Sequence, residues 1–381
     1  MKIEDKLFIL IIVLIMLGGL VKPILFPKET NYLENREANQ IPELSLTTIL
    51  DKTYQDDFEL ALADQIPLAG NMKLTNKTFN ILLTLAYSNI SNNNYVSLGS
   101  GIYLIENYIT YGRGSLKSKI PQLDIKISNF SLKKEQNPDV EFYLYYIEKD
   151  TDINFEDNDK LGAYEYIIEN LNPTIKAAKF EINNIDKYKE YFYRTDHHWN
   201  YKGSYKGYQE LTELMGLDNI ITPDDEVCLN LNWSGSKARA FGGQQIFKEE
   251  FCAYKFNFPE HTIFINNESA NNYGKYEEFF NGSGSEVSYG IFYGGDVGLL
   301  EFNYHQENKE NLLIIGESYD NAINELLASH FNKTYNVDLR AYEEDIGQEF
   351  NLNEFISEHD IDKVLLIGNI DYYTSNVFVL N

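Results

Sequence analysis

The chain has 381 residues, and its 32 Lys and Arg against 58 Asp and Glu give a formal net charge of −26. This acidic balance argues against a nucleic-acid-binding protein, which needs a basic surface to meet phosphates, and against docking on anionic lipids. Hydrophobic residues make up 43% of the chain, too many for a disordered protein and enough for a core. The two cysteines, Cys228 and Cys252, could pair, but they are too few for a disulfide scaffold or a four-cysteine zinc site.

An apolar segment lies near the N-terminus. Leu7 to Phe26 covers 20 residues, which as a helix would span about 30 Å, the thickness of the hydrocarbon core of a bilayer. Lys2 and Lys6 precede the segment and favour a cytoplasmic N-terminus. We therefore predict that residues 1–28 form a single transmembrane anchor at the cell membrane and that the rest of the chain is extracytoplasmic. A cleaved signal peptide, which would release a secreted protein, is the alternative.

Residues 29–110 are predicted to form a stalk, membrane-proximal helices and a hairpin. The stalk, residues 27–45, is polar and contains two prolines, a composition typical of extended segments. Apolar side chains recur at helical spacing through residues 47–85. Residues 94–106 surround a Gly-Ser-Gly turn with apolar residues, which indicates two short strands.

Residues 111–381 are predicted to form an α/β domain with a doubly wound, parallel sheet. Val140 to Ile147 is almost wholly apolar or aromatic, as expected of an interior strand. Residues 203–215 have the pattern of an amphipathic helix. Residues 223–300 are rich in Gly, Asn and aromatics without helical periodicity, so we predict a β- and loop-rich insertion there. Near the C-terminus, predicted strands alternate with predicted helices, which implies parallel pairing; the strands are 312–315, 335–339 and 364–367, and the helices 322–331 and 350–359.

A serine follows the first of these C-terminal strands, in the sequence Gly316-Glu317-Ser318-Tyr319-Asp320. Ligands of doubly wound sheets bind beyond the carboxyl ends of the strands. A hydroxyl at such a turn projects above the sheet, and the backbone N–H groups of Ser318 and Tyr319 are candidate donors to an oxyanion. The other interpretation is that Ser318 is only a helix N-cap.

The segment Arg194 to Asn200 (RTDHHWN) offers a base for this serine. A serine hydroxyl needs a base, which works best when a carboxylate fixes its tautomer. In an extended backbone, residues i and i+2 share a face, so Asp196 can reach the ring of His198 while His197 points the other way. We predict Ser318 as nucleophile, His198 as general base and acid, and Asp196 as the residue that orients it. A metal site of Asp196, His197 and His198 is the weaker alternative, because the sequence supplies no clear further ligands, and no cofactor is expected.

Three further residues near these motifs have two interpretations each. Trp199 is either a core anchor for its loop or a face on which a sugar stacks. Asn369, after the third C-terminal strand, either offers its amide to the oxyanion or is an ordinary turn residue. Arg340 either positions a carboxylate or an acidic sugar, or belongs to a structural ion pair.

The segment Tyr193 to Trp199, followed by Gly203, resembles the signature of the bacterial DHHW proteins, which are similar to the alginate O-acetylation proteins of the SGNH hydrolase superfamily. This resemblance implies an SGNH hydrolase-like α/β fold whose catalytic order is permuted, because the Asp-x-His element precedes the serine. The family usually has Asp or Thr where this chain has Glu317, a larger acid that could add negative charge beside the oxyanion. Further elements match in order along most of the chain: Glu34-Asn35-Arg36 with Pro42, Asp64-Gln65-Ile66-Pro67, Ser234-Gly235-Ser236, Leu313 to Tyr319, and Val337 to Arg340.

The resemblance also implies a function. It predicts an extracytoplasmic, serine-dependent acyltransferase or esterase that handles acetyl groups on a cell-envelope or exported polysaccharide. Relatives often work beside a multi-spanning membrane acyltransferase, which would be the acyl donor and a partner of this protein. The alternative is a non-catalytic glycan-binding or scaffold protein of such a modification system, since a fold does not guarantee its chemistry.

Overall fold

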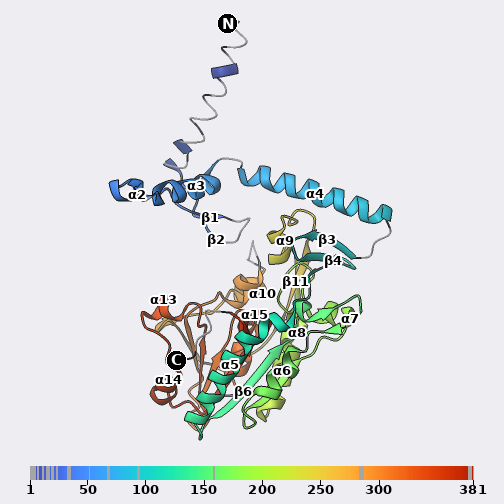
Figure 1. The fold of residues 1–381 in the computed structure, drawn as a ribbon. Coiled ribbons are helices and arrows are strands. Elements are labelled where there is room, and N and C mark those ends of the chain that lie inside the picture. The colour runs from blue at the N-terminus through green and yellow to red at the C-terminus, as the bar shows by residue number, and fades with distance from the viewer. Residues whose placement is uncertain are drawn as a thin grey trace. The chain divides into compact units, whose positions relative to one another are not determined.

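The computed structural model describes residues 6, 8–10, 13, 18, 21–22, 25–31, 36–50, 52–66, 69–91, 95–157, 159–282, 287–375 and 380. The chain divides into two compact units: residues 1–100 with 236–247, and residues 101–235 with 248–381 (Figure 1). The predicted anchor, Leu7 to Phe26, lies mostly outside the described residues. Among the residues that are described, no helix has both the length and the apolar character needed to cross a bilayer.

The first unit consists mainly of helices, as the periodicity of residues 47–85 predicted. The segment predicted as a stalk is held against one of these helices. The Asp64 carboxylate accepts a hydrogen bond from the backbone N–H of Asn39 at 2.9 Å, and Gln65 accepts one from the backbone N–H of Lys28 at 2.7 Å. The elements of this unit are β1 (Thr30–Asn31), β2 (Arg36–Glu37), α2 (Leu46–Leu50), α3 (Thr53–Gln65), α4 (Ala69–Ser91), β3 (Tyr95–Gly99) and α9 (Ser236–Ala240).

An eight-stranded sheet forms the centre of the second unit, in the order β13-β12-β14-β16-β15-β17-β6-β9. The five strands from β16 to β9 are parallel, so the predicted parallel core is confirmed. The antiparallel edge of β14, β12 and β13 was not predicted. The strands are β6 (Glu141–Ile147), β9 (Lys176–Phe180), β12 (Thr262–Ile265), β13 (Glu268–Ala270), β14 (Leu299–Asn303), β15 (Leu312–Ile315), β16 (Lys333–Val337) and β17 (Lys363–Gly368).

Alternate residues of the central strands are buried in two separate cores, one on each face of the sheet. In β15, for example, Leu312 and Ile314 belong to one core and Leu313 and Ile315 to the other. Helices α7, α8 and α12 cover the first core, and helices α5, α6, α14 and α15 the second. The helices of this unit outside residues 223–300 are α5 (Leu116–Gln136), α6 (Ala163–Asn170), α7 (Ile185–Tyr191), α8 (Tyr201–Met215), α12 (Asn324–Ala328), α13 (Tyr342–Ile346), α14 (Leu352–Glu358) and α15 (Ile370–Tyr373).

The region predicted as an insertion, residues 223–300, is only partly separate from the sheet. Its strands β12 and β13 extend the central sheet instead of forming an independent element. Its described residues also form three five-residue helices, which the prediction missed because a single turn and a half leaves no periodicity to detect. A β-hairpin within it carries a disulfide between Cys228 and Cys252, which face each other in the register. The elements of the second unit in this region are β10 (Asp225–Trp233), β11 (Glu249–Lys255), α10 (Tyr276–Phe280) and α11 (Tyr289–Tyr293), besides β12, β13 and the start of β14.

Candidate active site

The candidate site lies at the carboxyl ends of the parallel strands. Because β16, β15, β17 and β6 run in the same direction, the residues that follow them emerge at one edge of the sheet. Ser318 follows β15, Arg340 follows β16, Asn369 follows β17, and Lys149 follows β6. This is the edge at which open α/β sheets bind their ligands.

Three of the predicted residues form a continuous hydrogen-bonded chain. The Nδ1 atom of His198 lies 2.6 Å from Oδ1 of Asp196, and its Nε2 atom lies 2.8 Å from the Oγ of Ser318. A carboxylate can only accept hydrogen bonds, so the proton of a neutral imidazole resides on Nδ1 and Nε2 presents a lone pair to the serine hydroxyl. Asp196 and His198 are buried, whereas Ser318 is partly exposed. The geometry is that of a nucleophile, a base and a carboxylate that orients the base.

The His-His segment is not extended, and the prediction that His197 points away from Asp196 is wrong. Residues 194–198 form a continuous bend, stabilised where the Asp196 side chain accepts the backbone N–H of His198 at 3.1 Å. The bend places Nδ1 of His197 3.5 Å from the same Asp196 oxygen. The two imidazole rings lie 3.8 Å apart between centroids.

A tyrosine that the sequence did not single out fixes the plane of the base. The ring of Tyr289, at the start of α11, stacks on the ring of His198 with centroids 3.8 Å apart and an interplanar angle of 1°. Its hydroxyl accepts a hydrogen bond from the indole of Trp199 at 3.3 Å and donates one to the carbonyl of Tyr319 at 3.2 Å. Tyr289 therefore links the histidine loop to the turn that carries the serine.

A second unforeseen residue, Glu249 on β11, holds the backbone of the histidine loop. Its carboxylate accepts hydrogen bonds from the backbone N–H groups of Arg194 and Thr195, both at 2.7 Å, and from the Thr195 hydroxyl at 2.5 Å. Gly235 closes the loop from the other side by donating its N–H to Thr195 Oγ1 at 2.8 Å. A Cβ at Gly235 would lie 2.4 Å from the Cβ of Asp196, so only glycine fits there.

Trp199 is a core residue, so the first of its two interpretations is confirmed and the sugar-stacking one is wrong. Its side chain is completely buried and makes edge-to-face contacts with Phe180 and Tyr319. The ring occupies space left by Gly207 of α8, where a Cβ would come within 2.6 Å of it. With no exposed face, Trp199 cannot stack on a sugar.

The turn that carries Ser318 depends on the residues around it. A side chain at Gly316 would collide with the carboxylate of Asp320, whose Oδ2 would lie 1.8 Å from the added Cβ. The 3-10 helix η2 (Asp320–Ala322) has Tyr319, not Ser318, at its N-cap position, so Ser318 is not the N-cap of that helix. No described residue accepts a hydrogen bond from the backbone N–H of Ser318 or Tyr319, so both remain candidate donors to an oxyanion.

Glu317, the residue between Gly316 and Ser318, has polar and charged neighbours. The Asn369 amide donates to Glu317, while the Asn369 side-chain oxygen caps α15 by accepting the N–H of Asp371 at 2.9 Å. An Nη atom of Arg340 lies 3.8 Å from the Glu317 carboxylate. Burial raises the pKa of Glu317 to about 7, against the lowering effect of Lys149 and Arg340. Near neutral pH, the acid beside the serine is therefore partly protonated.

Asn369 and Arg340 thus have structural partners. The Asn369 amide is directed to the Glu317 carboxylate. Arg340 binds the Asp338 carboxylate through Nε at 2.9 Å, and its Nη2 atom lies 2.8 Å from Asp296. Arg340 therefore belongs to a structural ion-pair network, as one of its two interpretations predicted. Its guanidinium, 3.8 Å from Glu317, also lies next to the turn that carries Ser318.

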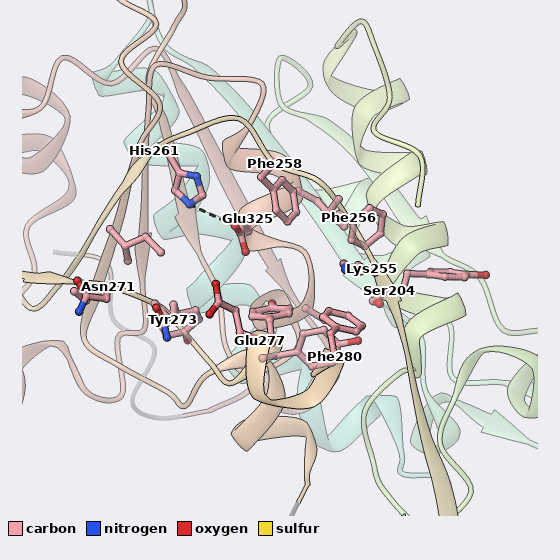
Figure 2. A pocket seen from close by; sticks show the side chains of 18 of the residues that line it. Ser204, Lys255, Phe256, Phe258, His261, Asn271, Tyr273, Glu277, Phe280 and Glu325 are labelled. Atoms are coloured by element: carbon pink, nitrogen blue, oxygen red, sulfur yellow. Dashed lines mark ion pairs between the residues drawn. The ribbon is translucent and has the colours of Figure 1, made fainter. Parts of the chain in front are cut away.

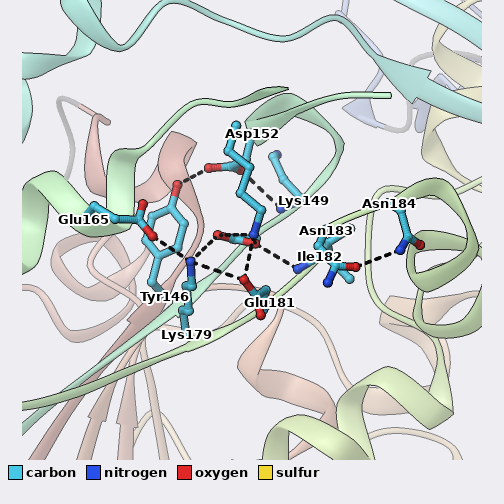
Figure 3. Close-up of polar contacts among 11 residues, drawn as sticks. Tyr146, Lys149, Asp152, Glu165, Lys179, Glu181, Ile182, Asn183 and Asn184 are labelled. Carbon is cyan, nitrogen blue, oxygen red and sulfur yellow. Dashed lines mark hydrogen bonds and ion pairs between the residues drawn. The ribbon is translucent and has the colours of Figure 1, made fainter. Parts of the chain in front are cut away.

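A network of lysines and carboxylates lies at the carboxyl end of β6 (Figure 3). Buried Glu148 lies 3.0 Å from the ammonium of Lys179 and 3.1 Å from that of Lys160, which fixes the end of β6 against the end of β9. The next residue, Lys149, is also buried, and its ammonium lies 2.6 Å from Asp371. Burial lowers the pKa of Lys149, but the carboxylates of Asp371 and Asp150 outweigh it and leave the pKa above its ordinary value. A fixed positive charge therefore lies in the electrostatic neighbourhood of Glu317.

The metal alternative meets a structural obstacle. Ligand atoms of Asp196, His197 and His198 all lie within 4.8 Å of one another, so the three could approach one ion. However, both ring nitrogens of His198 are engaged, one by Asp196 and the other by Ser318, and a metal would have to displace one of them. The grouping of Cys228 and Cys252 with a glutamate offers no thiolate, because the cysteines form a disulfide.

Solved structures of similar fold include two of PatB1 and one of a DHHW family protein. PatB1 of Bacillus cereus has a TM-score of 0.59 and 21% identity, over 74% of this chain and 99% of its own. A structure of PatB1 with a sulfonyl adduct has a TM-score of 0.57 and 19% identity, over 73% and 97%. A DHHW family protein from Eubacterium siraeum has a TM-score of 0.55 and 16% identity, over 74% and 93%. The structural neighbours therefore include the type of protein that the histidine signature predicted, and at these identities the likeness shows a common fold. No family model and no curated protein match the chain.

Proposed function

We propose that this protein is an extracytoplasmic, serine-dependent acyltransferase or esterase of the DHHW type, which handles acetyl groups on a cell-envelope or exported polysaccharide. The single observation that carries the proposal is the hydrogen-bonded chain from Ser318 through His198 to Asp196. It lies at the ligand-binding edge of the sheet, and the fold is shared with a DHHW family protein. The sulfonyl adduct of PatB1 is consistent with a nucleophile in a protein of this fold.

The chemistry proceeds through an acyl-serine. The Oγ of Ser318 attacks the acyl carbonyl carbon of the donor while Nε2 of His198 accepts the hydroxyl proton, and Asp196 stabilises the resulting imidazolium. His198 then gives that proton to the departing donor group, which leaves the acyl ester on Ser318. A sugar hydroxyl or water attacks this ester, transfers its proton to His198 and releases the acylated sugar or the free acid. The proton returns to Ser318 Oγ.

Negative charge develops on the carbonyl oxygen in both steps. The N–H groups of Ser318 and Tyr319 are the donors proposed to stabilise it. Protonation of Glu317 favours both steps, since an ionised carboxylate beside the serine would oppose that charge. The positive charges of Lys149 and Arg340 also limit the effect of Glu317.

The proposed compartment rests on the disulfide between Cys228 and Cys252, because such bonds persist in oxidising environments. Together with the apolar N-terminal segment, it favours a domain outside the cytoplasm. The acyl donor would then be delivered by a multi-spanning membrane acyltransferase, since activated acyl groups are made inside the cell.

The direct test is incubation of the full chain with an activated acetyl ester, followed by intact-protein mass spectrometry and measurement of ester turnover. We expect a single acetyl adduct on Ser318, and loss of both adduct and turnover in Ser318→Ala. His198→Ala should lose turnover by roughly 10⁶-fold. Ser118→Ala and His305→Ala, at exposed positions outside the hydrogen-bonded chain, are the matched controls and should retain activity. Turnover that survives in both Ser318→Ala and His198→Ala would exclude the proposal.

A non-catalytic glycan-binding protein is the second candidate. The observation that favours it is a large cavity of about 750 Å³, lined by many aromatic residues and not by Ser318 or His198. It predicts that a sulfonyl fluoride leaves Ser318 unlabelled while glycan binding persists. Labelling of Ser318 that is lost in His198→Ala would instead favour the enzyme.

A further inference from the structure

A cavity of the second unit lies apart from the serine. It has a volume of about 750 Å³ and is bounded by α8, α10, α12 and the segment around β12 and β13. Catalytic candidates Ser318, His198 and Asp196 are absent from its lining. Its volume is within the range of small-molecule sites and is sufficient for more than one sugar ring.

Aromatic rings form much of the wall of this cavity. Tyr276 and Phe280 of α10 contribute to it, as do Tyr205 of α8 and Phe256 and Phe258. In Figure 2, the labelled phenylalanine side chains lie on one side of the Glu325 and Glu277 carboxylates. Amide and hydroxyl groups of Asn271, Asn272, Asn281 and Ser204 also line it, so the lining combines flat apolar faces with hydrogen-bonding groups.

A recessed carboxylate faces this aromatic wall. Glu325 of α12 lines the cavity, and one fifth of its side chain remains exposed. Its Oε1 atom lies 3.4 Å from Nε2 of His261, whereas no described residue is hydrogen-bonded to its Oε2 atom. Burial raises the pKa of Glu325 to about 7, because the surroundings provide little compensation for a negative charge.

His261 does not fully satisfy the hydrogen-bonding capacity of the Glu325 carboxylate. Nδ1 of His261 lies 2.9 Å from the carbonyl of Pro259, which can only accept, so Nδ1 carries a proton. In a neutral His261, Nε2 would then be a bare acceptor facing a carboxylate. The contact is favourable only when one of the two groups holds an additional proton. The other charged groups of the cavity are Glu277 and Lys255.

We propose that this cavity binds an amino sugar whose protonated amine pairs with Glu325 and whose ring stacks on the aromatic wall. An ammonium group supplies the hydrogen-bond donors that Oε2 lacks, and aromatic faces attract cations directly. The asparagines provide partners for sugar hydroxyls. The cavity's preference for an amine follows from its own residues, whereas the choice of a sugar to carry the amine rests on the proposed function. The cavity would hold the acceptor glycan at a distance from the serine.

The test is isothermal titration calorimetry of the full chain at pH 7, where a substantial fraction of Glu325 is ionised, with a glucosamine tetrasaccharide and with the N-acetylglucosamine tetrasaccharide. Only the first carries protonated amines. We expect the amine form to bind at least tenfold more tightly, and Glu325→Gln to abolish this preference while circular dichroism and melting temperature show an intact fold. Tyr276→Leu should weaken both ligands, because it removes part of the stacking surface.

Controls separate the cavity from the general acidity of the chain. Glu213→Gln removes an exposed carboxylate of α8 and should retain the preference. The titration is repeated in Ser318→Ala, in which acyl transfer is impossible but the cavity is unchanged. If both tetrasaccharides bind equally, or if Glu325→Gln retains the preference for the amine, the proposal is wrong. Binding that persists in a protein without ester turnover would instead reject the proposed function alone.

Discussion

Replacing Glu317 with glutamine removes a buried carboxyl group whose titration is coupled to folding. Burial raises its pKa from 4.5 to about 7, so the folded state holds the proton more tightly than the unfolded chain does. Between pH 4.5 and 7, the unfolded state loses this proton while the folded state keeps it, and stability falls as the pH rises. At 1.36 kcal/mol per pKa unit, this fall amounts to about 3 kcal/mol. Below pH 4.5 both states are protonated, and above pH 7 the loss is complete.

Glutamine does not titrate, so Glu317→Gln should lack this component of the pH dependence. The free energy of unfolding of the variant relative to the wild-type protein should therefore rise by about 3 kcal/mol from pH 4 to pH 8. Urea unfolding followed by tryptophan fluorescence measures this difference. Both tryptophans of the chain, Trp199 and Trp233, belong to the second unit, so the signal reports the unit that contains Glu317.

The comparison between two pH values cancels the effects of the substitution that do not depend on titration, including any change in the contact with Asn369. Glu354→Gln, at an exposed position of α14, is the control for the general removal of a negative charge. If the difference between Glu317→Gln and the wild-type protein is the same within about 0.5 kcal/mol at pH 4 and pH 8, the carboxyl group is not buried as described and the reasoning fails.

Two further predictions concern Tyr289 and the disulfide. Tyr289→Leu should lower kcat for ester turnover by roughly 10- to 100-fold with little change in KM, because His198 loses the ring that fixes its plane. Tyr289→Phe keeps that ring and should retain most activity. Equal losses in both variants would contradict a role for stacking. Replacing Cys228 and Cys252 with serine opens a loop closed over a separation of 24 residues and should cost about 3 kcal/mol of unfolding free energy, measured by urea denaturation; a loss below about 1 kcal/mol would show that the hairpin is closed without the bond.

Local patterns predicted much of the sheet. The apolar character of Val140 to Ile147 placed an interior strand, and β6 is flanked by β17 and β9. The alternation of strands and helices after residue 312 predicted parallel pairing, which β15, β16 and β17 have. The antiparallel edge escaped prediction because β12 and β13 are four and three residues long, too short for a distinctive pattern.

Within the candidate site, sequence proximity and topology suggested which groups would meet. The spacing of Asp196 and His198 suggested a contact, and Oδ1 of Asp196 lies 2.6 Å from Nδ1 of His198. Nothing local could reveal Tyr289, one of 29 tyrosines, or Glu249, because each acts on the histidine loop from a distant segment. The orientation of His197 was misjudged because the bend of residues 194–198 depends on these same distant contacts.

The sequence by itself determined which residues are candidates for catalysis, the alternation of strands and helices, and the edge of the sheet at which a serine follows a strand. These properties depend on residues that are close in the sequence and on the regular repeats of helices and strands. Only the tertiary structure decided that Trp199 is completely buried, that Arg340 is paired with Asp338 and Asp296, and that the pKa of Glu317 rises to about 7. Burial and electrostatic shifts are sums over groups that are remote along the chain, so they exist only once the chain has folded.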